Sequence, residues 1–268
     1  MTDYAAAYAD PANPYHREAR SLADKIRDPA HCAIGPDAVA RWVSNGTVIP
    51  ADCADLAAAI GMPVNRPVMD ATRSRDYEFD AHWALYVENY LEGLHIPFVH
   101  PGLSRTLDLA QYEYELFAWG NLQLAVAREG EVAFEPPPGS PDHGRRIAAY
   151  YYWLFPNLML NVYPWGLSVN LVQPLSATRT RVAFRSYVGR PELLGTGAGG
   201  ALDEVELEDE AVVMSVQRGL RSRFYQHGRY SPTRELGVHQ FHRLVGMAMG
   251  AHQPALAEPQ VRGPGRAA

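Results

Sequence analysis

Residues 88–103 read ENYLEGLHIPFVHPGL and hold the most informative pattern of the chain. Glu92 and His95 stand three residues apart, a spacing that places both side chains on one face of a helix. His100 follows five residues after His95, which on a straight helix turns its ring about 140° away. Pro97 lacks the N–H of a continuing helix, so we expect the helix to end or bend there and bring His100 back. Two imidazoles with one carboxylate from elsewhere would bind Fe(II) and leave positions open for oxygen.

The plain alternative is two ordinary histidines near a helix end, because single histidines in apolar surroundings are commonly half-buried without binding a metal. The pair, however, belongs to a longer pattern: an acid, two residues, His, four residues, a second His, and then Pro-Gly-Leu at residues 101–103. This pattern resembles the catalytic-domain signature of the Rieske non-haem iron ring-hydroxylating oxygenases. The resemblance spans about residues 75–250 and favours the metal site.

The resemblance implies a third iron ligand in a helix predicted over residues 205–224. Apolar residues recur there at helical spacing, and acids crowd the first turns. Alone, such acids would indicate a stabilised helix N-terminus and a solvated face. Glu208 and Asp209, followed by QRGL at residues 217–220, resemble the family segment whose aspartate completes the iron triad. That assigns Asp209, with Glu208 as the alternative ligand.

Two further residues near the motif receive roles from the same resemblance. Glu92 is expected to orient His95 and to carry electrons to the iron, because the matching acid bridges an iron ligand to a Rieske-ligand histidine of another subunit. Its outer face should be a docking surface. Asn89 is expected beside the iron, and a plain polar helix residue is an equal alternative. His239 and His242 are a weaker metal candidate, because no acid or cysteine accompanies them.

The substrate pocket should be apolar with a few polar contacts, as small-molecule sites generally are. Its candidate residues, taken from segments that converge on the motif by analogy, are Leu94, Phe98, Tyr152, Asn161, Tyr163 and Trp165. Most aromatic residues on alternating strands are simply core residues. Tyr163 and Trp165 could also hold a methylammonium group through cation–π attraction, in keeping with a resemblance to the choline- and carnitine-type oxygenases.

Family members also carry a Rieske [2Fe–2S] cluster, held by two cysteines and two histidines of an N-terminal domain. This chain has two cysteines, Cys32 and Cys53, and neither has the nearby downstream histidine that the family motifs require. We therefore expect Fe(II) but no [2Fe–2S] cluster in this chain. Electrons should come from a separate Rieske protein and an NAD(P)H-dependent reductase, and the resemblance implies a homo- or hetero-oligomer built on trimers.

The expected fold class is α+β, a helix-grip (START-like) fold in which helices, among them a long C-terminal helix, pack on a twisted antiparallel sheet. Alternating apolar segments between residues 112 and 190 predict the strands. A helix over residues 80–94 should deliver the metal motif. Ser231 and Pro232 should open the last helix as its N-cap and first residue.

Three parts are expected along the chain. Residues 1–70 suggest a helical appendage that ends in a proline-marked linker, residues 71–254 the oxygenase domain, and residues 255–268 a disordered tail.

Composition narrows the class of protein. The 268 residues are 47% hydrophobic, enough for a large core, and carry a net charge of −6 without a basic stripe, which disfavours nucleic acid. The two cysteines form no disulfide framework, and no long apolar run or leader is present, so we expect a cytoplasmic protein without a membrane span. One lysine among 24 basic residues is typical of a GC-rich bacterial genome.

The sequence thus predicts an oxygenase component that hydroxylates or oxidatively demethylates a small aromatic or methylammonium substrate with O2. One alternative is a redox-inactive ligand-binding or scaffolding subunit of an oxygenase complex. Another is a hydrolase that holds zinc on the same triad, because ligands alone do not determine the metal.

Overall fold

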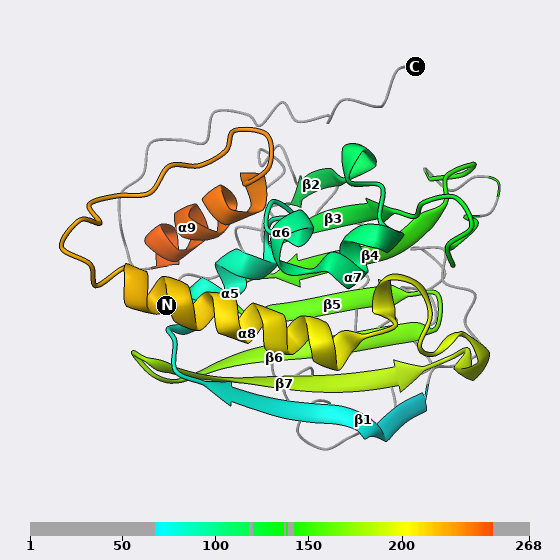
Figure 1. Cartoon of the computed structure of the whole chain (residues 1–268), viewed down its shortest axis with the longest axis horizontal. Coiled ribbons are helices and arrows are strands. Elements are labelled where there is room, and N and C mark those ends of the chain that lie inside the picture. The colour runs from blue at the N-terminus through cyan, green and yellow to red at the C-terminus, as the bar shows by residue number, and fades with distance from the viewer. Residues whose placement is uncertain (1–67, 118–119, 137, 139–141, 249–268) are drawn as a thin grey trace.

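The computed structural model describes residues 68–117, 120–136, 138 and 142–248 (Figure 1). One antiparallel sheet of seven strands runs through this part of the chain, in the order β1-β7-β6-β5-β4-β3-β2. The strands are β1 (Val68–Phe79), β2 (Glu113–Phe117), β3 (Gly120–Val126), β4 (Ile147–Leu154), β5 (Leu158–Tyr163), β6 (Gly166–Ser176) and β7 (Arg179–Val188). The α-helices are α5 (Trp83–Tyr90), α6 (Ile96–Val99), α7 (Pro101–Thr106), α8 (Leu202–Gly219) and α9 (Leu236–Ala248). The predicted α+β class with an antiparallel sheet is confirmed.

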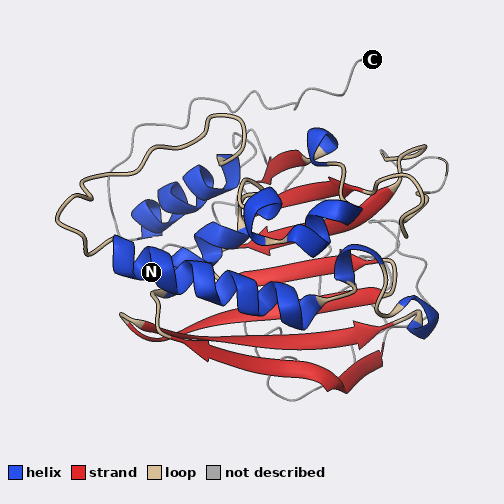
Figure 2. Ribbon diagram, in the orientation of Figure 1, coloured by secondary structure: helices blue, strands red, loops and turns tan. Residues whose placement is uncertain are grey.

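The helices gather on one side of the sheet, and the long helix α8 runs across its middle strands (Figure 2). Apolar side chains from three helices and the sheet meet in one core beneath them. Phe241 of α9 is fully buried and packs nearly perpendicular to two tryptophans, Trp83 of α5 and Trp153 of β4, at centroid distances of 5.6 and 5.5 Å. Val213 of α8 is buried in the same core. This packing holds α5 and α8 beside each other, and the site lies between them.

Helix α5 ends earlier than the sequence predicted. Its last residue is Tyr90, so Glu92 lies in the turn beyond the helix. Gly93 suits that turn, because its backbone N–H donates to the Tyr114 hydroxyl at 3.0 Å and a Cβ there would lie 3.1 Å from the Tyr112 ring. Pro97 does not end a helix; it stands in the first turn of α6, where a missing N–H costs nothing. The expected helix over residues 80–94 is therefore wrong in its C-terminal part.

Strand β1 was not predicted, and it crosses the expected boundary between residues 70 and 71. It is an edge strand with mostly exposed side chains, so its sequence lacks the apolar alternation by which strands are recognised. Ion pairs hold it to β7 instead: Asp76 pairs with Arg185 at 2.7 Å, and Glu78 with Arg179 at 2.9 Å. Residues 1–67 and the tail expected over 255–268 lie outside the described residues.

The last helix also begins later than predicted. Ser231 starts a turn in which its N–H donates to the Glu235 side chain at 2.5 Å, and α9 proper begins at Leu236. Among the described helices, none combines the length and the apolar character that crossing a membrane requires.

Candidate metal centre and cavity

The two motif histidines flank the short helix α6. His95 is its N-cap, and His100 is both its C-cap and the N-cap of α7. One helical turn separates them, and their ring centroids lie 5.0 Å apart with an angle of 80° between the ring planes. A straight helix could not point both rings to one place. The chain does so through a turn before His95 and a second change of direction at His100.

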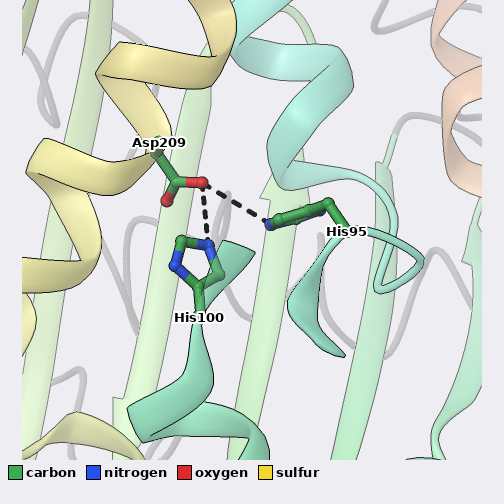
Figure 3. Close-up of side chains that lie close together, drawn as sticks. All are labelled: His95, His100 and Asp209. Carbon is green, nitrogen blue, oxygen red and sulfur yellow. Dashed lines mark hydrogen bonds and ion pairs between the residues drawn. The ribbon is translucent and has the colours of Figure 1, made fainter. Parts of the chain in front are cut away.

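Asp209 of α8 reaches both rings (Figure 3). Its Oδ1 lies 3.0 Å from His100 Nε2 and 3.5 Å from His95 Nε2. His100 is 1% exposed in its side chain, and His95 and Asp209 are 15% and 16% exposed. In the described part of the chain, these three residues form one cluster of potential metal ligands, with ligand atoms within 4.8 Å of one another.

A carboxylate lies behind each imidazole. Glu92 Oε1 contacts His95 Nδ1 closely, and Glu208 Oε2 lies 2.7 Å from His100 Nδ1. When Nδ1–H donates a hydrogen bond, the ring is held in the tautomer whose Nε2 lone pair is free to bind a metal. Both Nε2 atoms therefore face Asp209 as potential ligands, and Glu208 occupies the opposite side of His100, away from the cluster.

Asn89 orients the carboxylate of the cluster. Its side-chain amide donates to Asp209 Oδ1 at 2.5 Å from the neighbouring helix α5. Burial alone lowers the pKa of His100, but its hydrogen bonds with Asp209 and Glu208, together with their charges, outweigh burial and raise it. Without an ion, the acids thus favour a proton on the same ring that would ligate a metal.

The distances from Asp209 to the two rings suit a shared metal ion. Bonds of about 2.0–2.2 Å from nitrogen or oxygen place neighbouring ligand atoms about 3.0 Å apart at right angles and about 3.4 Å apart at tetrahedral angles. The distances of 3.0 and 3.5 Å from Asp209 Oδ1 to the two rings fall in this range. Two imidazoles and one carboxylate suit Fe(II) with open positions, and the same set also accepts zinc.

A cavity of about 90 Å³ opens beside the cluster. Aromatic rings dominate its wall: Tyr86, Tyr90, Tyr112, Tyr151, Tyr163 and Phe184. Two pairs of its polar groups bond to each other. Tyr90 donates to Asn161 Oδ1 at 2.7 Å, and Tyr112 donates to Gln123 Oε1 at 3.2 Å. Burial raises the pKa of Tyr90 and Tyr112, so the hydroxyl groups stay neutral.

The catalytic-domain profile of the ring-hydroxylating alpha subunits matches residues 69–251. The chain belongs to this family. The match includes all three residues of the cluster and every described strand except the first residue of β1.

Two curated relatives and one solved structure illustrate the likeness. Choline monooxygenase, chloroplastic, from Arabidopsis thaliana is 36% identical in an alignment of 180 residues that covers 64% of this chain and 40% of the relative. The carnitine monooxygenase oxygenase subunit of Escherichia coli (strain K12) is 31% identical in an alignment of 179 residues that covers 62% of this chain and 46% of the relative. A quaternary ammonium Rieske monooxygenase superposes with a TM-score of 0.56 at 25% identity, covering 76% of this chain and 55% of that chain. The chain thus spans less than half the length of these curated relatives.

Within this family member, two of the six predicted pocket residues, Asn161 and Tyr163, line the cavity. The structure places the other four outside it. Leu94 and Phe98 are 46% and 84% exposed. Tyr152 lies on the opposite face of the sheet from its neighbour Tyr151, because side chains alternate along a strand. Trp165 stacks on Tyr163 at 5.3 Å, and its N–H donates to the Gly199 carbonyl at 3.1 Å, so it does not reach the cavity.

Several lining residues were not predicted from the sequence. Tyr151 could have been found from strand register, because it pairs directly with Asn161 across β4 and β5. Tyr86 stands three residues before Asn89 on α5 and shares its face. Glu206 carried no signal at all, since it stood among acids expected to face solvent. His239 and His242, the weaker metal candidate, lie outside the cluster, and His242 Nε2 contacts Glu88 at 2.6 Å.

Proposed function

We propose that the chain is the mononuclear non-haem Fe(II) component of an oxygenase that hydroxylates or oxidatively demethylates a small organic substrate with O2. The observation that carries this proposal is the convergence of His95, His100 and Asp209 on one point at the wall of an aromatic cavity. Membership of the ring-hydroxylating family supports iron over zinc. Iron bound there would supply the activation of O2, which no amino-acid side chain performs.

The surrounding residues prepare the ligands. Glu92 and Glu208 hold the two rings from their Nδ1 sides, and Asn89 holds Asp209 from α5. Such outer contacts fix ligand orientation and increase ligand basicity. The buried wall of tyrosines keeps bulk water away from the reacting face, and its neutral hydroxyl groups offer hydrogen bonds without charge.

The substrate of the proposed reaction is compact. A buried water needs about 10–15 Å³, so a cavity of about 90 Å³ holds about six to nine waters or a molecule of a similar number of heavy atoms. Small aromatic compounds and methylammonium compounds both meet this limit. The names of two relatives, choline monooxygenase and carnitine monooxygenase oxygenase subunit, support the second class.

Electrons for the proposed reaction come from a separate Rieske [2Fe–2S] protein, supplied by an NAD(P)H-dependent reductase. Glu92 is the point of entry, because its carboxylate contacts His95 and its side chain is 12% exposed. The solved relative is described in terms of inter-subunit electron transfer, which supports an oligomer in which one subunit reduces another. A trimer-based assembly and a cytoplasmic location remain predictions, and the matched choline monooxygenase is chloroplastic by name.

Metal analysis of protein purified without oxygen tests this function. We expect one iron per cluster, and turnover of substrate only after a Rieske protein and its reductase are added. Stoichiometric zinc with hydrolytic activity would identify a hydrolase instead. Protein that binds no metal but still binds small ligands would be the redox-inactive subunit. Steady oxygenation with a reductase alone would contradict the need for a separate Rieske donor.

A further inference from the structure

Glu206 is a carboxylic acid buried in the wall of the cavity. It lies on α8 three residues before Asp209, and it is 3% exposed. The Tyr86 hydroxyl donates to its Oε2 at 2.6 Å. Its other oxygen, Oε1, is buried and has no hydrogen-bond partner among the described residues. An unpaired polar atom in a folded interior is costly and calls for a partner that enters from elsewhere.

The placement of Glu206 reverses the ordinary pattern of a surface helix. The next residue, Leu207, is 59% exposed, whereas the acid points inward. Two parallel contacts between α5 and α8 hold this arrangement: Tyr86 with Glu206, and one turn further along both helices, Asn89 with Asp209. Helix α8 therefore directs Glu206 into the cavity one turn before Asp209, the proposed metal ligand.

The described lining of the cavity has carboxylates but neither lysine nor arginine. The carboxylates are those of Glu92, Glu206 and Asp209. Two of these acids already have partners at the cluster, His95 for Glu92 and both rings for Asp209. Glu206 is the acid with a free acceptor, and tyrosine rings surround the same space. Aromatic faces with one carboxylate form a site that attracts a cation whose charge is spread over methyl groups.

We propose that Glu206 is the charge-selecting residue of this cavity, and that its carboxylate pairs with a methylated ammonium group of the substrate. The proposal rests on the proposed function, because it specifies which of the two substrate classes occupies the cavity. It also predicts that a second, negative charge on the bound part of the substrate is disfavoured, since neither lysine nor arginine lines the described wall to receive it.

Binding of the cation is coupled to release of a proton. Burial raises the pKa of Glu206 well above its usual range, although the Tyr86 hydrogen bond lowers it. The groups that face Glu206 are Tyr77 and Tyr86 from β1 and α5, and Asp203, Asp209 and Glu210 on its own helix, and the acids among them favour the neutral form. Burial therefore favours the neutral form of Glu206 when no cation is bound. When an ammonium group enters, the carboxyl O–H bond breaks, the proton leaves to solvent, and the carboxylate remains as the counter-ion.

Titration calorimetry with choline and its uncharged tert-butyl isostere, 3,3-dimethylbutan-1-ol, tests the proposal on the chain of 268 residues without reductant. In the unaltered chain, choline should bind more tightly than the alcohol. Measurement in buffers of different ionisation enthalpy should show proton release with choline and none with the alcohol. At pH values below the pKa of Glu206, choline affinity should rise by up to about tenfold per pH unit, because the acid must lose its proton to bind the cation.

The Glu206→Gln variant keeps the size of the side chain and an acceptor for Tyr86 but cannot ionise. We expect at least about tenfold weaker choline binding, no proton release, and unchanged binding of the alcohol. Glu204→Gln removes the same charge from an exposed position of the same helix and should bind both probes as the unaltered chain does. Equal binding of choline to the unaltered and Glu206→Gln proteins would overturn the proposal. Loss of alcohol binding alone would instead make Glu206 a neutral hydrogen-bond donor.

These measurements are independent of the test for the oxygenase. Iron content and turnover decide the proposed function, whereas discrimination between a charged and an uncharged probe decides the role of Glu206. Thermal unfolding of Glu206→Gln shows whether a loss of binding reflects a loss of fold. The comparison of the two probes on the unaltered chain needs no variant, and choline binding no tighter than that of the alcohol overturns the proposal by itself.

Discussion

The two histidines of the cluster are held in the same way by partners of very different origin. Glu92 lies three residues before His95, and its contact forms within one turn of the chain. Glu208 lies 108 residues after His100, and its contact exists only where α8 packs against α6. Both acids act at Nδ1, but the first belongs to a local motif and the second to the tertiary fold. Two equivalent contacts of one site can therefore differ in whether a local sequence pattern predicts them.

The largest effect on iron content should follow removal of any one of the three proposed ligands. Alanine at His95, His100 or Asp209 should abolish stoichiometric iron, because two remaining protein ligands hold a labile divalent ion poorly. Iron per chain after desalting measures this. A His239→Ala, His242→Ala double variant is the control and should keep its iron, because neither residue belongs to the cluster. The assignment fails if the double variant loses iron while His100→Ala keeps it.

The local pair should reveal a role in electron transfer. Glu92→Gln should keep iron yet slow oxygenation by about 10- to 100-fold, because its carboxylate lies behind a ligand at the proposed point of electron entry. Rates with the Rieske partner and after chemical reduction should be compared. Chemical reduction should partly restore the rate, since the transfer step is then bypassed. An unchanged rate with the partner would assign Glu92 to ring orientation alone.

The long-range pair should show a smaller and different effect. Glu208→Gln should lower iron affinity by about tenfold, near the small end of such losses, because glutamine can still accept from Nδ1 and the side chain is 29% exposed. Iron titration measures this, and chemical reduction should restore nothing, because no electron path is removed. Asp209→Asn is the matched variant. Retention of iron there, with complete loss in Glu208→Gln, would make Glu208 the ligand.

The smallest effect is expected at Phe98, between the two histidines in the chain. Its side chain is 84% exposed. Phe98→Ser should therefore change the free energy of unfolding by no more than about 0.5 kcal/mol and leave iron content and ligand affinity unchanged. Denaturant unfolding and calorimetry measure these quantities. A tenfold loss of ligand affinity would instead place Phe98 in the binding site, as the sequence analysis first expected.

The strands illustrate what sequence patterns can and cannot predict. Strands β2 to β7 were anticipated because their side chains alternate or are apolar enough to stand out between turns. Strand β1 was not predicted, because an edge strand held by ion pairs, such as Asp76 with Arg185, lacks the alternation of apolar residues that marks a strand. The end of α5 was misplaced because Pro97 is as compatible with starting a helix as with ending one.

For the site, sequence alone predicted the residues with a local pattern: His95, His100 and Glu92 through their spacing, and Asp209 through its resemblance to a family segment. Tertiary structure decided which atoms meet. Packing of α8 on α5 turned Asp209 toward both rings, sent Glu208 behind His100, and buried Glu206 in the cavity. The physical reason is that spacing along a helix fixes which side chains share a face, whereas only the docking of that face decides whether it meets solvent, protein or ligand.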